Sequence, residues 1–260
     1  MTAILRIESR KRVRGTLILA GLFVVISAFF LLAFPGFAEE AAVIEAAFPG
    51  YIVGLLGFEE LHTIEGFAGG YVYPLLWILL AGGYIASVSA GLIVDDIRDR
   101  RLDLLLSNPV SRESVVLQKV ASLWLPLVVL NVVLWLVLYV GAFLISESID
   151  PGALTMVHLL SIPYLLVCAG IGVVASVVAN RTDRAQVAAF GLVGLLWLVD
   201  GLSELDEDFE WIGAVTPSRY IDPTAIFVHE EYAFFDAGVL LAAFLVLLGV
   251  AIAVFVRRDI

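Results

Sequence analysis

Apolar residues form long runs along this chain, and the segments between the runs hold nearly all of the charge. Six runs are long enough, or almost long enough, to cross the ~30 Å hydrocarbon core of a membrane as helices. Only helices and closed barrels satisfy their backbone groups in lipid, so runs of this length predict an all-α, polytopic membrane protein. The predicted spans are residues 15–34, 72–94, 120–145, 154–179, 185–202 and 237–256, within one membrane domain, 1–260.

Two of these spans carry features that bear on where they end. In the second, Tyr71, Tyr73 and Trp77 are predicted to anchor the helix at the membrane–water interface, where amphipathic rings are favoured. In the fifth, only residues 185–199 are free of charge, which is short for a full crossing. Either this helix ends at a thinned interface or it takes in residues of the following loop.

The basic residues set the orientation of the chain. If six spans are drawn, all of the 15 Lys and Arg residues except Arg219 fall on the side that holds both termini. The positive-inside rule then predicts a multi-pass protein of the cytoplasmic membrane with cytoplasmic N- and C-termini. Most of the 26 acidic residues fall on the outer side. An outer face this acidic suits a high-salt exterior, so a halophilic archaeal source is a hypothesis.

The first 14 residues form a basic segment in which apolar side chains alternate with charged ones. One interpretation is an amphipathic interfacial helix that lies on anionic membrane lipid. The alternative is a plain positive flank of the first span. A cleaved signal peptide is disfavoured, because its apolar core is usually only ~7–15 residues long.

The most highly charged segment, residues 95–119, lies between the second and third spans. From Arg98 its pattern predicts a short helix with Leu102, Leu105 and Leu106 on one side. Asp96 and Arg100 lie four residues apart, which is in reach across one helical turn.

Asn108 precedes Pro109 and is predicted to stop that helix, since the residue before proline is disfavoured in the α region. Ser111 is then predicted to cap a second helix, with Glu113 in its first turn. Two helices joined by a hard stop form a rigid bent element that can pass force between a soluble partner and the membrane.

Several classes of chemistry have no sequence signature here. There is no phosphate-binding loop ending in Gly-Lys-Ser/Thr, no His-Glu-x-x-His metal motif and no Gly-x-Ser-x-Gly elbow. Within the predicted spans, His158 is the one ionisable group well inside, whereas ion-coupled transporters usually keep paired charges there. Cys168 is predicted to be a small buried hydrophobe. We therefore expect no cofactor or metal in this chain and no nucleic-acid partner, and a secondary transporter is disfavoured.

The segment 95–119 resembles the connection between the second and third spans of ABC-2 type transporter permeases. In that family an acidic residue is followed by a Gly-Thr-Leu-like turn, a leucine run, Ser-x-Pro-Val-Ser-Arg and Gly-Lys. The matching residues here are Asp96, Leu102, Asp103, Leu104 to Leu106, Ser107, Pro109 to Arg112 and Lys119. The chain departs from the pattern at Arg100-Arg101, which replace the small pair, and at Gln118, which replaces the glycine. The basic start, the six spans, the Pro-x-x-Tyr pattern at 217–220 and the tail at 255–260 are also similar.

The resemblance implies the membrane-spanning subunit of an ATP-driven exporter that has no catalytic activity of its own. ATP would be bound by a separate ABC ATPase subunit, and a second permease, either another copy or a paralogue, would complete the transporter. The helix around residues 98–106 would be the cytoplasmic coupling helix. The implied ATPase-coupling residues are Asp96, Arg98, Arg101, Leu102, Asp103, Leu105, Ser107, Pro109 and Arg112.

The cargo implied by uncharged spans is hydrophobic or amphipathic, and lipids, drugs, peptides and metal-centre assembly all stay open. The apolar parts of the two long outer loops, residues 46–58 and 211–215, would be re-entrant caps. Two alternatives remain. The first is that the charges at Arg98, Arg101, Asp103 and Arg112 serve only to set the membrane orientation. The second is that the chain is a polytopic membrane enzyme or assembly scaffold without an ATPase partner.

Overall fold

The computed structural model describes residues 3–49, 59–107, 110–203 and 207–258. Among these residues, six helical stretches are long and apolar enough to cross a membrane. They are Ala3–Ala41, Ile64–Arg98, Arg112–Leu144, Pro151–Val178, Thr182–Ser203 and Phe234–Arg257. All six predicted runs therefore lie in helices, and the prediction of an all-α polytopic membrane protein is confirmed.

Three of the six stretches have boundaries that their residues explain. The fourth, α9 (Pro151–Val178), begins after Asp150, whose carboxylate accepts from the amide of Ala153, with Pro151 at the first helical position. The third breaks after α7 (Arg112–Ala121) and resumes as α8 (Trp124–Leu144), so that Pro126 lies in the first turn of α8, where a missing N–H is tolerated. The fifth, α10 (Thr182–Ser203), takes in residues at both ends of the short charge-free run.

Two stretches form the centre of the bundle. The second consists of α3 (Ile64–Phe67), the wider π-helical segment η1 (Ala68–Ala81), α4 (Gly82–Ala90) and α5 (Val94–Arg98). It packs along α9, and these two are mostly buried, whereas the other four stretches present most of their surface outward. Gly82 of α4 and Gly172 of α9 make this contact close. A Cβ on Gly172 of α9 would collide with the carbonyl oxygen of Ala86 and lie 2.7 Å from Cβ of Ser89.

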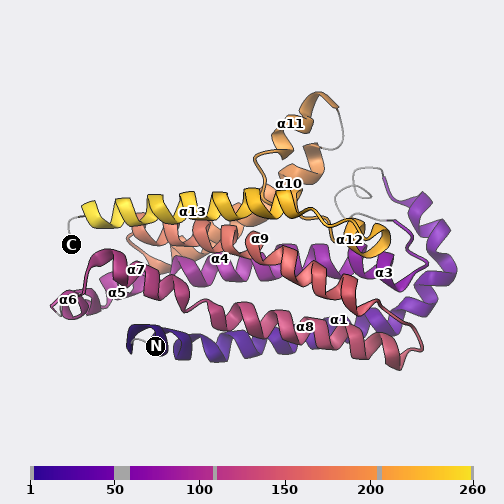
Figure 1. The fold of residues 1–260 in the computed structure, drawn as a ribbon, viewed down its shortest axis with the longest axis horizontal. Coiled ribbons are helices and arrows are strands. Elements are labelled where there is room, and N and C mark those ends of the chain that lie inside the picture. Colours follow the sequence, from indigo (N-terminus) through magenta and orange to yellow (C-terminus); the bar gives the residue numbers. More distant parts are fainter. Residues whose placement is uncertain (1–2, 50–58, 108–109, 204–206, 259–260) are drawn as a thin grey trace.

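The remaining helices surround this centre. Helix α13 (Phe234–Arg257) lies along α9, α8 pairs with α1 (Ala3–Ala47), and α10 packs on α4. The N- and C-termini lie at the same end of the bundle as α5, α6 (Arg101–Leu106) and α7, as Figure 1 shows. We call this the terminal end. The opposite end holds α3, α12 (Pro223–His229) and the last turns of α1.

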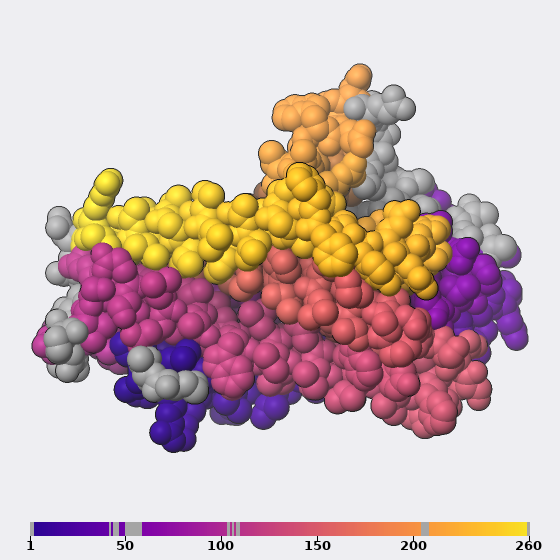
Figure 2. Space-filling view, viewed as in Figure 1, coloured from indigo at the N-terminus to yellow at the C-terminus, as the bar shows by residue number. Residues whose placement is uncertain are grey.

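The helices at the surface can be followed in the space-filling view. In Figure 2, α13 forms a long ridge on one face, and the last part of α10 together with α11 (Glu210–Gly213) projects from the body near the middle of its length. Residues 211–215, predicted to belong to a re-entrant cap, lie in this projection. Most of the other predicted cap, residues 50–58, lies outside the described residues.

Two predictions about the spans were wrong. The basic residues 3–14 do not form a separate interfacial helix, because α1 is continuous from Ala3 to Ala47 and they are its first turns. Tyr73 and Trp77 are not interface anchors, because both side chains are fully buried. Tyr73 Oη lies 3.0 Å from Nε2 of His158, and Trp77 Nε1 donates to Ser161 Oγ at 2.7 Å.

The bond to Tyr73 also explains how His158 can be buried. A packed histidine of this kind is what the sequence predicts for a lone histidine near a span end. Its Nδ1 lies 3.1 Å from Oδ1 of Asn131, so both ring nitrogens have partners across three helices. Cys168 is buried as predicted.

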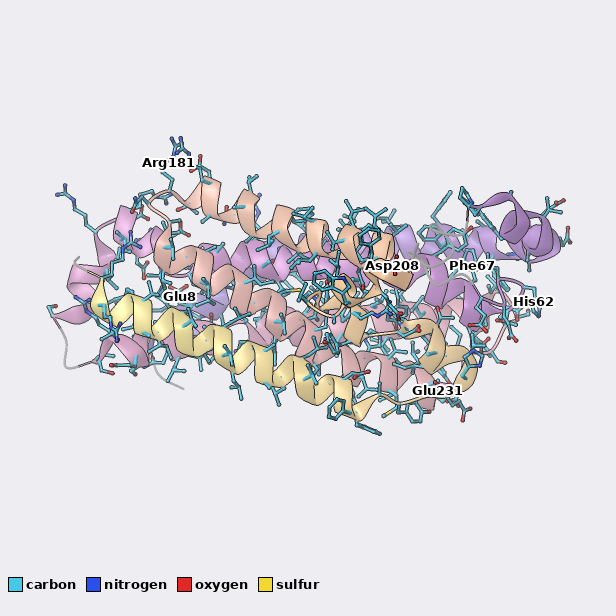
Figure 3. All side chains as sticks on the ribbon, turned by 90° about the horizontal axis from the view of Figure 1, so that it is seen from above. Glu8, His62, Phe67, Arg181, Asp208 and Glu231 are labelled. Atoms are coloured by element: carbon cyan, nitrogen blue, oxygen red, sulfur yellow. The ribbon has the colours of Figure 1, made fainter. Side chains whose placement is uncertain are left out.

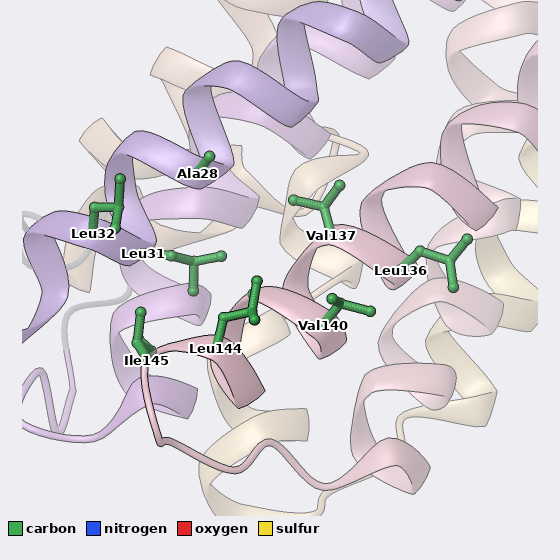
Figure 4. Close-up of a pocket in the computed structure, with 9 residues that line it drawn as sticks. Ala28, Leu31, Leu32, Leu136, Val137, Val140, Leu144 and Ile145 are labelled. Carbon is green, nitrogen blue, oxygen red and sulfur yellow. The ribbon is translucent and has the colours of Figure 1, made fainter.

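On the outside of the bundle, an apolar groove of about 500 Å³ runs along the contact between α1 and α8. Figure 4 shows side chains from both helices lining it, among them Ala28 and Leu32 of α1 and Val137 and Val140 of α8. Leu31 fills the space above Gly141, where a Cβ would collide with its Cδ1. None of the described residues that line the groove has a polar side chain, so the groove can accommodate lipid chains.

Candidate functional site

The charged segment at the terminal end begins with α5. This helix and α6 are separate, so the segment does not form one continuous coupling helix. Helix α5 ends at Arg98, and Arg100 adopts a left-handed conformation with φ of 53° before α6 starts at Arg101. The predicted helix over residues 98–106 was therefore wrong in its first turn. A non-glycine residue at positive φ breaks a right-handed helix. Asp96 and Arg100 consequently lie on separate elements, and Asp96 is paired elsewhere.

The cap and the first turn of the predicted second helix are confirmed. Ser111 caps α7 by accepting from the amide of Ser114 at 3.2 Å, and Glu113 lies in the first turn. Leu102 is buried, Leu105 is half-buried against the core, and Ser107 lies exposed in the turn after α6. Asn108, Pro109 and the side chains of Asp103 and Leu106 lie outside the described residues.

Asp96 belongs to a buried ion cluster that joins three helices. Lys119 of α7 extends its ammonium to Asp96 of α5, with 2.6 Å from Nζ to Oδ2, and to Glu8 of α1, with 3.3 Å from Nζ to Oε1. The exposed fractions of these side chains are 1% for Lys119, 3% for Asp96 and 8% for Glu8. Charges this far from water are tolerated only when they are paired and hydrogen-bonded. The cluster therefore fixes α1, α5 and α7 to one another (Figure 3 shows Glu8 at this end).

Two predicted coupling residues form the exposed side of this cluster. Arg98 bonds to Asp99, with 2.9 Å from Nε to Oδ1, and lies 3.7 Å from Asp95. Arg101 bonds to Asp99 and lies 3.9 Å from Asp96. Both guanidinium side chains are about half exposed, at 57% and 49%. The hydrogen bond from Arg98 lowers the pKa of Asp99 below its ordinary value, so this carboxylate stays ionised. The two arginines present positive charge at the surface, and ion pairs with neighbouring carboxylates hold their side chains in place.

Arg112, the last predicted coupling residue, is engaged within the chain. Its Nη1 donates to the carbonyl oxygens of Phe255, Val256 and Arg258 at 3.2, 3.2 and 2.7 Å. Its guanidinium also lies 5.9 Å from the centroid of the Phe255 ring. A cation at the last carbonyls of a helix satisfies acceptors that have no intrahelical donor. Arg112 thus ties the start of α7 to the end of α13.

This position provides a test that separates anchoring from partner binding. Replacing Arg112 with alanine removes the donor for three carbonyls, so we expect faster amide hydrogen exchange in the last turn of α13 and a loss of about 1.5–3 kcal/mol in local stability. The amides of α10 serve as the internal reference. Unchanged exchange at residues 253–257 would contradict the anchoring role.

Further bonds connect the terminal end to the central helices. Ser176 of α9 accepts from the amides of Ile93 and Val94 at 2.8 and 3.1 Å, and so caps the start of α5. Thr182 of α10 donates to Asp95 at 2.5 Å. Arg258 donates to the carbonyls of Val177 and Ala179 at the end of α9. These bonds connect α5 to α9 and α10, and they connect the end of α13 to the end of α9.

Sequence reasoning missed the partners that complete this site. Glu8 is the one acidic residue among the basic first 14, and Lys119 is the last charge before the third span. A lone charge of opposite sign in a basic segment was the available signal for Glu8. Ser176 and Thr182 gave no signal, because a hydroxyl near a span end is common.

The comparisons with known proteins agree with this architecture. The family model for the ABC-2 family transporter protein matches residues 2–260. A search of the curated proteins found no match. Since the family model covers almost the whole chain, and six helices are of membrane-spanning type, this protein belongs to the ABC-2 transporter family as a multi-pass membrane component of the permease type.

Proposed function

We propose that this protein is the membrane-spanning subunit of an ABC exporter, and that it couples ATP hydrolysis in a separate ATPase subunit to movement of cargo across the cytoplasmic membrane. A second permease, either another copy or a paralogue, completes the pathway. The termini and the terminal end face the cytoplasm, where the ATPase lies. Hydrolysis takes place in the partner, and this chain holds no ATP or other cofactor of its own.

The observation that supports this proposal most strongly is the construction of the terminal end. Arg98 and Arg101 are exposed and positive, yet the segment that carries them is fixed by the buried ion pairs of Lys119 with Asp96 and Glu8. Arginines that only set the membrane orientation need neither a buried ion pair beneath them nor a helix cap from another span, such as Ser176 provides. A surface that binds a moving partner needs both exposed contacts and a stiff connection to the helices that must move.

A groove next to these arginines gives the proposed partner a place to dock. It has a volume of about 610 Å³ and lies between the first turns of α1 and residues of α5, α6 and α7. Apolar side chains such as Ile4, Ile7 and Leu105 line it, and Arg101 lies among its charged lining residues. An apolar centre with a charged rim is the usual composition of a protein interface.

The cargo we propose is hydrophobic or amphipathic. The apolar parts of the four outer stretches carry few charges and expose apolar side chains, and the buried polar groups around His158 bond to one another. Such walls offer no fixed charge to select an ion.

The test is a pull-down of the tagged chain from its native membrane in mild detergent, followed by mass spectrometry. We expect an ABC ATPase to accompany the wild-type chain. The double variant Arg98→Glu/Arg101→Glu should recover at least ~30-fold less ATPase, because two reversed charges remove a central contact. The thermal unfolding midpoint of the purified variant, measured in parallel, shows whether it is folded.

Arg181→Glu is the matched control. Arg181 lies at the same end, is 60% exposed, bonds only to its neighbour Asp183 among the described residues, and points away from the bundle in Figure 3. We expect this variant to retain the ATPase. If the folded double variant retains it as well, the coupling surface lies elsewhere. If no ATPase accompanies an intact wild-type chain, the enzyme or scaffold alternative takes precedence.

A further inference from the structure

A second pocket at the terminal end lies between α1, α4, α5 and α10, and its lining is mainly polar. Its volume is about 360 Å³. Among the residues that the structure describes, five basic and four acidic side chains line it, together with Tyr84 and Gln186. The basic residues are Lys11, Arg12, Arg98, Arg101 and Lys119, so the lining carries one net positive charge.

The pocket lies at the level where a membrane changes from hydrocarbon to head groups. Its lining includes Arg12 and Gly15, where the charge-free run of α1 begins, and Gln186, one residue after the start of the charge-free run of α10. Below it both helices present apolar side chains outward. Ile18 of α1 is 65% exposed and Val187 of α10 is 74% exposed. Phosphate groups of phospholipids lie at this boundary, with their chains along the apolar surface beneath.

One donor in the lining has no acceptor. The side chain of Arg12 is only 9% exposed, and its Nη1 bonds to Glu8, yet its Nε has no hydrogen-bond partner among the described residues. A buried guanidinium N–H without an acceptor destabilises the protein, because the group has lost its hydrogen bonds to water and gained none in return. An anionic oxygen entering the pocket supplies such an acceptor, and guanidinium groups bind phosphate strongly.

We propose that this pocket binds the head group of an anionic membrane phospholipid, whose acyl chains lie against the exposed sides of α1 and α10. The acidic residues that line the pocket are already engaged. Glu8 and Asp96 bond to Lys119, and Asp95 accepts from Thr182. The bound lipid then connects the basic start of α1 to α10 at the same level as the ion cluster. This site does not depend on an ATPase partner.

The experiment compares thermal unfolding of the purified chain in nanodiscs of phosphatidylcholine with and without phosphatidylglycerol. A bound anionic lipid stabilises the folded state, so we expect phosphatidylglycerol to raise the midpoint by roughly 3–6 °C. Gln186→Glu places a carboxylate in the lining at nearly constant volume and should abolish this rise. Gln118→Glu is the matched control, because Gln118 is the other glutamine of the chain and does not line this pocket. It should keep the rise.

Several results would overturn the proposal. They are no rise in the wild-type chain, an equal rise in Gln186→Glu, or an equal rise caused by inorganic phosphate in phosphatidylcholine alone, which would indicate a soluble anion. If Gln186→Glu does not fold, Lys11→Gln removes one half-exposed cation of the lining and takes the same measurement. A folded Lys11→Gln variant with an undiminished rise would also count against the site.

Discussion

Replacing Lys119 with methionine is expected to destabilise the protein by about 3–5 kcal/mol, the usual loss when one partner of a buried ion pair is removed. The methionine keeps most of the volume and removes only the charge. Among the ion pairs of the described residues, Asp96, which is 3% exposed, would then keep only the distant Arg101 at 3.9 Å, and Glu8 would lose its contact with α7. Thermal unfolding of the detergent-purified variant, followed by tryptophan fluorescence and size-exclusion chromatography, measures this loss.

Lys11→Met is the matched control, because Lys11 is the other lysine of the chain and bonds to the same carboxylate. Its Nζ lies 2.6 Å from Oε1 of Glu8, but its side chain is 42% exposed. An exposed pair of this kind contributes about 0–1 kcal/mol, so we expect little change. Adding Asp96→Asn to Lys119→Met should recover part of the loss by removing the unpaired charge. Equal effects of the two lysine variants would show that burial of the cluster does not govern its energy.

Replacing Gly172 with leucine is expected to prevent native packing of α9 against the second span. Even a single Cβ at this position collides with the carbonyl oxygen of Ala86 and approaches Ser89, and the backbone of α4 cannot yield as a side chain end does. Overpacking usually destabilises by 1–3 kcal/mol, and here we expect about 3 kcal/mol or more because both central helices must separate. The monodisperse fraction after solubilisation and the unfolding midpoint measure the outcome.

Gly249→Leu is the comparison for this variant. Gly249 lies in α13, and a Cβ there meets no atom within 4 Å. The same substitution should therefore leave stability within about 0.5 kcal/mol of the wild type. A well-folded Gly172→Leu protein with an unchanged midpoint would mean that α4 and α9 are farther apart than the structure places them.

The sequence predicted the spans well because the signal for them is local. A membrane crossing needs a certain length of apolar helix, and each run can be judged alone. It was less informative about which spans are central. Tyr73 and Trp77 have the composition of interface anchors, and only the packing of η1 against α9 reveals that they bond to His158 and Ser161.

The candidate site was predictable in the same uneven way. The cap at Ser111 follows from neighbouring residues and is confirmed. The break at Arg100 was missed because the leucine spacing over 98–106 fits one helix, and the left-handed residue has no compositional mark when it is not glycine. The pairing of Lys119 with Glu8 was missed because it joins residues on either side of two whole spans.

That separation in the chain has a consequence for how the protein is made. Glu8 leaves the ribosome before the first span and Lys119 after the second, so their bond can form only once both spans have been inserted and the chain has returned to its starting side. A nascent chain whose second span fails to insert holds the two charges on opposite sides of the bilayer. The bond between Lys119 and Glu8 therefore forms only in a chain that has inserted both spans, and a misinserted chain lacks this connection between α1 and α7.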